Sequence, residues 1–147
     1  MSRLLFAATN TPFEDVRYSL DFSTGKPVRP EFDAAKAAGA FPMGQVPVLV
    51  ATVDGKKTSV CQSKTIGRYI ASKTGLLGST PEEAADIDSV CETVVDLLNA
   101  SGAAKTDEEK AAFVADKLTN TLATLEGLIG SGYAVSGKLS QADVVRE

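Results

Sequence analysis

The chain of 147 residues contains no histidine and only two cysteines, Cys61 and Cys91. Without an imidazole, a serine–histidine triad and a histidine-ligated zinc site are both excluded. The two cysteines form no Cys-x-x-Cys pattern, so a thioredoxin-type redox motif is excluded as well. We therefore expect two free thiols in a reducing compartment and no bound metal.

Positive charge and long apolar runs are also scarce. The net charge is −4 and the basic residues form no cluster, which argues against nucleic-acid binding because that binding depends on neutralising phosphates. No apolar run approaches the roughly 18 residues of a membrane span, and the first residues turn polar too soon for a signal peptide. We expect a cytoplasmic protein that contacts neither nucleic acid nor membrane, with a core supported by its 44% hydrophobic residues.

The segment from Gly44 to Ile70 is the most informative part of the sequence. Pro47 stands at the head of an apolar, β-rich run, where proline removes a ladder donor. Asp54-Gly55 between two such runs is a strong hairpin signal. Gln62-Ser63 at the start of a helix places side-chain oxygens beside free backbone N–H groups, which suits a carboxylate ligand.

Four motifs occur in this order: Gly-Gln-Val-Pro-Val-Leu, Asp-Gly-Lys-Lys, Gln-Ser and Ile-Gly-Arg-Tyr-Ile-Ala. With them the chain resembles the cytosolic glutathione transferases, closest to the sigma-like group, from about Arg3 to Val145. The resemblance implies an α/β plus all-α fold. A thioredoxin-like, glutathione-binding domain without its first strand would cover residues 1–75, a linker residues 76–79, and a partial all-helical domain residues 80–147. We expect the chain to be truncated at both ends relative to that family.

Local patterns predict the elements of the first half. Leu4 to Asn10 reads as the end of a helix, stopped by Thr11-Pro12. Alternation of apolar and polar residues over 13–20 predicts a strand with Val16, Tyr18 and Leu20 on one face. The remaining expectations are a weak helix or irregular arm at 31–40, a hairpin of 46–53 and 56–60, and a helix at 62–74 that ends at Gly75.

Three helix-start signals follow in the second half. They are Thr80-Pro81-Glu82-Glu83, Thr106-Asp107-Glu108-Glu109 and Ser140-Gln141-Ala142-Asp143. Apolar residues after the second signal predict a helix of roughly six turns that closes at Gly130. Leu139 and Val144 are placed for a hydrophobic staple around the third signal.

The resemblance implies a set of glutathione-binding residues. In the family the bond corresponding to Val46–Pro47 is cis, and the backbone of Val46, beside Gln45, pairs with the peptide like an added strand. Gln62 and Ser63 would hold the γ-glutamyl end. From the residues alone, it is an equally good interpretation that Gln62 or Ser63 simply caps the helix. It also stays open whether Pro47 is an ordinary proline of an edge strand.

Two further contacts are implied more weakly. Lys36 would reach the glycyl carboxylate of glutathione, the alternative being a solvated lysine on a mobile arm. Asp88, Glu92 and Asp96 form an acidic stripe four residues apart; Asp96 corresponds to a family aspartate that reaches the glutathione of the partner subunit. The alternative for the stripe is a solvated helix face. The stretch from Asp54 to Gln62 is two residues longer than usual, and we place the extra length near Thr58-Ser59.

The catalytic tyrosine that stabilises the glutathione thiolate in sigma-like members lies on the opening strand, which this sequence lacks. Tyr18, Tyr69 and Tyr133 are interpreted as structural, so no catalytic residue is identified. Three functions remain open. The first is a glutathione transferase or glutathione-dependent isomerase acting on electrophiles, homodimeric at full length; the second is a non-catalytic binding or assembly module; the third is redox chemistry at Cys61.

Overall fold

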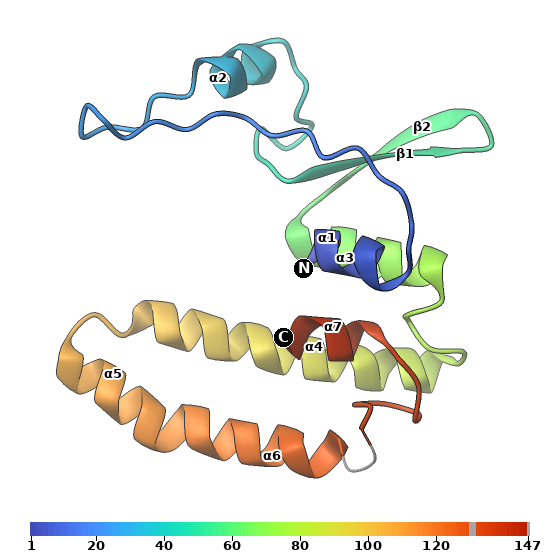
Figure 1. Cartoon of the computed structure of the whole chain (residues 1–147), viewed down its shortest axis with the longest axis vertical. Helices are drawn as coiled ribbons and strands as arrows, with labels where there is room; N and C mark the ends of the chain where they lie inside the picture. Colours follow the sequence, from blue (N-terminus) through green and yellow to red (C-terminus); the bar gives the residue numbers. More distant parts are fainter. Residues whose placement is uncertain (130–131, 147) are drawn as a thin grey trace.

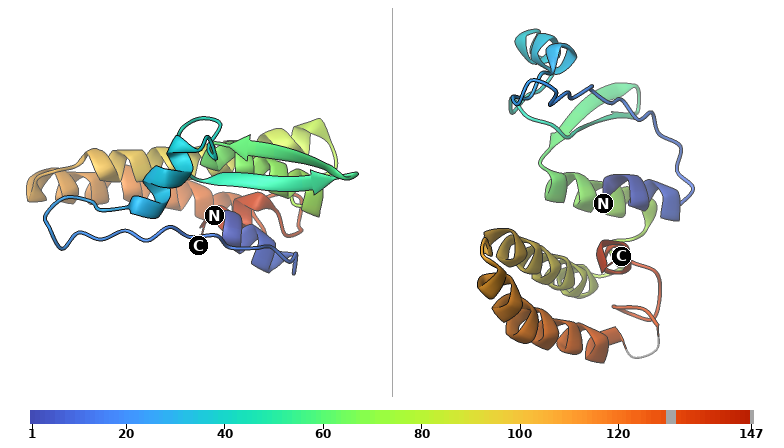
Figure 2. Two further views of the ribbon diagram at one scale, coloured as in Figure 1. Left: turned by 90° about the horizontal axis from the view of Figure 1, so that it is seen from above. Right: turned by 60° about the vertical axis from the view of Figure 1, so that its left-hand side comes forward.

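The computed structural model describes residues 1–129 and 132–146, arranged as stacked layers (Figure 1). A hairpin and a short helix form one end, a helix pair lies in the middle, and a helical layer forms the other end (Figure 2). The elements are α1 Ser2–Ala8, α2 Pro30–Ala37, β1 Val48–Val53, β2 Lys56–Cys61, α3 Ser63–Thr74, α4 Pro81–Ala103, α5 Asp107–Phe113, η1 Val114–Leu118, α6 Thr119–Ile129 and α7 Gln141–Arg146.

The predicted hairpin is confirmed. All six residues of β1 pair with all six of β2 in antiparallel register, from Val48↔Cys61 to Val53↔Lys56. Asp54 and Gly55 both have positive φ, 51° and 75°, as a two-residue type I′ turn requires. The ladder is regular at Ser59 and Thr58, which pair with Val50 and Ala51. The extra length expected for this stretch stays a prediction.

The predicted strand at 13–20 is wrong. The segment runs as extended coil, and Val16 and Leu20 are 63% and 54% exposed. A strand forms only where a neighbouring strand satisfies its N–H and C=O groups, and among the described residues the sheet contains β1 and β2 alone. The alternating pattern therefore has no partner. A single bridge, Asp21↔Val28, is the nearest approach to pairing.

One apolar core joins α1, α3 and α7. Its buried members are Leu5, Ile66, Ile70, Ala71, Leu76 and Val144. Burial of the face of α3 that carries Ile66 and Ile70 sets the orientation of that helix, because apolar residues at helical spacing must share one side. Gly75 ends α3 in the left-handed conformation, as predicted. Beside this cap, the Gln141 N–H donates to the Leu76 carbonyl at 2.8 Å and attaches α7.

The three predicted helix starts are confirmed. Thr80 and Thr106 each accept a backbone bond from the glutamate three residues later, and at Thr106 the full reciprocal box forms. At the third start the Ser140 N–H donates to the Asp143 carboxylate at 2.9 Å, as in a capping box, and the Ser140 hydroxyl also donates to it, at 2.8 Å. Asp143 also accepts from the Ala134 N–H at 2.8 Å.

The helix expected after Thr106 forms, with one local change. The π-turn η1 separates α5 from α6. Thr119, the first residue of α6, donates from its hydroxyl to the Val114 carbonyl five residues back. The predicted stop at Gly130 falls outside the described residues. No helix of the described part combines the length and apolarity needed to cross a bilayer.

Leu5 is fully buried whereas its neighbour Leu4 is 47% exposed, which offers a matched pair of substitutions in α1. We expect Leu5→Ala to lower the free energy of unfolding by about 2–4 kcal/mol, since it removes buried methylenes and leaves a cavity. Leu4→Ala should change it by less than about 1 kcal/mol. Urea unfolding of both variants checks this, and equal losses would contradict the assigned core.

Candidate functional site

The hairpin register brings two of the predicted site segments together. Because Val48 pairs with Cys61, the residues before β1 and after β2 lie at the same open end of the hairpin, opposite the Asp54-Gly55 turn. Gln45, Val46 and Pro47 lead into β1, and Gln62 and Ser63 leave β2 to begin α3. The five candidates of the two segments therefore adjoin, and all five are exposed.

The Val46–Pro47 bond is cis, as the family resemblance predicted. Val46 is 49% exposed. Among the described residues, none of the backbone bonds outside helices and strands involves Val46, and it precedes the ladder. Its N–H and C=O groups are thus available to an extended ligand.

Gln62 and Ser63 do not cap their helix through their side chains. Gln62 occupies the N-cap of α3 with φ 71° and ψ 121°, and no side-chain cap bond forms there. A non-glycine residue at positive φ is uncommon, and strained conformations of this kind cluster at ligand sites. The simple-cap interpretation of these two residues is therefore not realised in the described structure.

Lys36 lies on α2, which packs through an aromatic cluster near the loop that leads into β1. The rings of Phe32 and Phe41 stack at 5.1 Å between centroids, and Tyr18 meets Phe41 edge-on at 5.6 Å. A Cβ added at Gly44 would lie 3.9 Å from Lys36 Nζ. The ammonium is therefore beside the loop that leads into Val46.

Tyr18 packs against Phe32 and Phe41, whereas the strand face that it was expected to share with Val16 and Leu20 does not form. Tyr69 lies on α3 with Lys73 Nζ 5.8 Å from its ring centroid. Tyr133 lines a hollow of about 350 Å³ between α1 and residues 132–144. This hollow adjoins Asp143 and Val144 rather than the open end of the hairpin.

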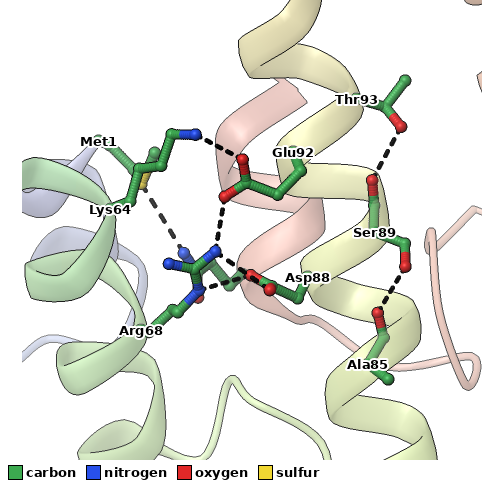
Figure 3. A network of polar contacts seen from close by, with 9 residues as sticks. Met1, Lys64, Arg68, Ala85, Asp88, Ser89, Glu92 and Thr93 are labelled. Atoms are coloured by element: carbon green, nitrogen blue, oxygen red, sulfur yellow. Dashed lines mark hydrogen bonds and ion pairs between the residues drawn. The ribbon is translucent and has the colours of Figure 1, made fainter.

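The acidic stripe on α4 is divided between two environments. Arg68 donates from Nε to Asp88 at 2.6 Å and from Nη2 to both Asp88 at 3.1 Å and Glu92 at 2.6 Å. Lys64 pairs with the other oxygen of Glu92. Figure 3 shows these four side chains converging between α3 and α4. Asp96, one turn further, is exposed, and no ion pair to it forms among the described residues.

Sequence reasoning missed this network. Lys64 and Arg68 are four apart on α3, and Asp88 and Glu92 are four apart on α4, so two charged ridges of opposite sign were the available signal. The orientation of the two helices, which the sequence did not reveal, decides that these ridges face each other. Asp88 raises the pKa of Arg68, and Lys64 is the main cause of the lowered pKa of Glu92.

Both cysteines are free thiols. Cys61 ends β2 and is half-buried, whereas Cys91 is buried in the core beside Ile87 and Ala142. Burial is the main cause that raises the pKa of Cys91 to about 11. In the described part of the chain, no acidic and sulfur ligands gather into a metal-binding group.

A family model described as "Glutathione S-transferase, N-terminal domain" matches residues 1–72. The chain is 33% identical over 156 aligned residues to glutathione S-transferase S1 of Drosophila melanogaster, covering 97% of this chain and 55% of that protein. It is 32% identical to glutathione S-transferase 3 of Caenorhabditis elegans, covering 99% and 70%. It is 34% identical to hematopoietic prostaglandin D synthase of Gallus gallus, covering 65% and 41%.

Solved structures resemble it over nearly the whole chain. The Ascaris lumbricoides glutathione S-transferase superposes with TM-score 0.72 at 30% identity, covering 98% of this chain and 69% of that one. A Necator americanus transferase described as monomeric gives 0.71 at 28% identity, covering 98% and 69%. The likeness confirms the predicted thioredoxin-like and helical architecture. The matched part of the chain corresponds to between 41% and 70% of the length of these proteins.

The depressed pKa of Glu92 predicts a pH-dependent contribution to stability. A carboxylate with a lowered folded-state pKa favours folding above its ordinary value of 4.5, and this contribution is lost as pH falls through the folded-state pKa. We expect Glu92→Gln to unfold at lower urea than wild type at pH 7, and we expect the difference to narrow as the pH falls below 4.5. Asp86→Asn on α4 is the control; a gap independent of pH would contradict the pairing.

The two cysteines should differ in reactivity. At pH 8 we expect iodoacetamide to modify Cys61 first, because Cys91 is 4% exposed and holds its proton. Peptide mass spectrometry measures the order. In Cys61→Ser the fast phase should vanish until urea is added; rapid labelling of Cys91 in the folded chain would contradict its burial.

Proposed function

The chain belongs to the glutathione S-transferase family, and from that premise we propose that it binds glutathione at the open end of the β1–β2 hairpin. The proposed activity is transfer of the glutathionyl group to electrophilic substrates. In that reaction the thiolate sulfur forms a bond to an electrophilic carbon. A leaving group departs with the electron pair of its bond to that carbon or, in an addition, the π bond breaks and its second carbon takes up a proton. The residues of this chain hold and orient the tripeptide.

The observation that carries the proposal is the start of α3. Gln62 sits at positive φ with an exposed side chain, Ser63 follows it, and no acidic residue occupies the first turn. Free N–H groups at a helix N-terminus favour an anionic ligand. The γ-glutamyl carboxylate of glutathione is such a ligand.

The other candidates extend the same site. The free backbone of Val46, between Gln45 and Pro47, pairs with the cysteinyl residue of the peptide. Lys36, beside Gly44, meets the glycyl carboxylate. Asp96, exposed at the end of the acidic stripe, reaches the α-amino group of a glutathione held by a partner subunit.

Similarity to a prostaglandin D synthase supports placement in the sigma-like group. It also favours a second candidate reaction, isomerisation of a substrate with glutathione as cofactor. A detoxifying enzyme of the cytosol is the physiological setting we propose. A homodimer is the assembly we propose, and a monomeric relative makes sedimentation of the purified protein the test of that point.

Glutathione binding is tested by isothermal titration of the 147-residue chain. We expect Gln62→Ala and Ser63→Ala each to weaken binding about tenfold or more, because each removes a hydrogen bond to a charged group. Ser72→Ala on the same helix, whose hydroxyl bonds the Tyr69 carbonyl at 2.8 Å, is the control and should bind like wild type. Absence of binding by wild type would contradict the proposal.

Turnover separates an enzyme from a non-catalytic binding module. Conjugation of a chlorinated aromatic electrophile above the glutathione-only background supports the transferase. Tight glutathione binding without any turnover by the protein isolated from its native cells would instead favour the binding module.

A further inference from the structure

The first turn of α3 has no apolar anchor. Residues 62, 63 and 65 are exposed, and the first buried residue of the helix is Ile66. The turn that carries Gln62 and Ser63 is therefore not fixed by the core, although its conformation at Gln62 is an uncommon one.

Lys64 lies within this turn, next to Ser63. A positive charge there is unfavourable for the helix, because it adds to the positive end of the macrodipole. Glu92 of α4 offsets that charge through a direct ion pair with Lys64. Among the described residues, this pair is the only ion pair or side-chain hydrogen bond that ties residues 62–65 to another element.

Glu92 is itself held in place. Its second oxygen accepts from Arg68 Nη2 at 2.6 Å, and Arg68 is bonded twice to Asp88. One carboxylate thus joins two successive turns of α3 to α4 (Figure 3). The bond from Arg68 limits rotation of the Glu92 carboxylate and so keeps its other oxygen directed at Lys64.

We propose that Lys64 is a positioning residue of the ligand site, acting through Glu92 to hold the first turn of α3 so that Gln62 and Ser63 face the ligand carboxylate. This inference rests on the proposed glutathione binding. It assigns to Lys64 no contact with the ligand. The pair is 44% and 39% exposed on its two side chains, so its effect should be moderate.

The test measures the glutathione dissociation constant by titration calorimetry for a set of charge variants. We expect Lys64→Met and Glu92→Gln each to weaken binding about fivefold, since either change breaks the same tie. Lys64→Arg should bind like wild type. The exchange Lys64→Glu with Glu92→Lys should recover part of the loss, although it leaves two cations beside each other at Arg68. Lys73→Met, the same change at the far end of α3, should have no effect.

The two single variants could instead change the affinity in opposite directions, with Lys64→Met weakening and Glu92→Gln strengthening binding. That result would show that the lysine charge acts on the ligand directly, and it would overturn the positioning role. Unchanged affinity in both single variants would overturn it as well. If the wild-type chain binds glutathione, these results contradict only the positioning role of Lys64 and leave the proposed function standing. If wild type does not bind, the proposed function fails first and this inference fails with it. Thermal melts of all variants confirm that each is folded.

Discussion

Helix α3 is held from two sides, and the rest of the structure depends on that attachment. Ile66 and Ile70 are buried against α1 and α7, while Arg68 and Lys64 reach α4. Burial of such side chains contributes about 1.5–3 kcal/mol each, whereas half-exposed ion pairs contribute less. Packing therefore provides most of the stability, and the ion pairs add direct links between α3 and α4.

The hairpin adds a geometric constraint to that attachment. Pairing of Val48 with Cys61 delivers the chain into α3 beside the loop that precedes β1. A slip of one residue would turn every side chain of a strand to the other face and would separate Pro47 from Gln62.

Features determined by a few neighbouring residues could be predicted from the sequence. The Asp54-Gly55 turn, the Gly75 cap and the Thr106 box depend on local dihedral preferences and adjacent N–H groups. The strand expected at 13–20 does not form, since a strand needs a partner and no periodicity reveals whether one is present. The pairing of Lys64 with Glu92 depends on how two helices face each other. Of the candidate site, the sequence indicated Gln62, Ser63 and Val46, but not what holds their turn in place.

The central claim is that one end of the hairpin, rather than the hollow beside Tyr133, receives the ligand. Amide chemical-shift mapping of the isotope-labelled chain during a glutathione titration tests it most directly. The account predicts saturable shifts at Gln45, Val46, Gln62 and Ser63, with smaller ones near Lys36. Shifts confined to α1 and residues 132–144, or none at all, would contradict it.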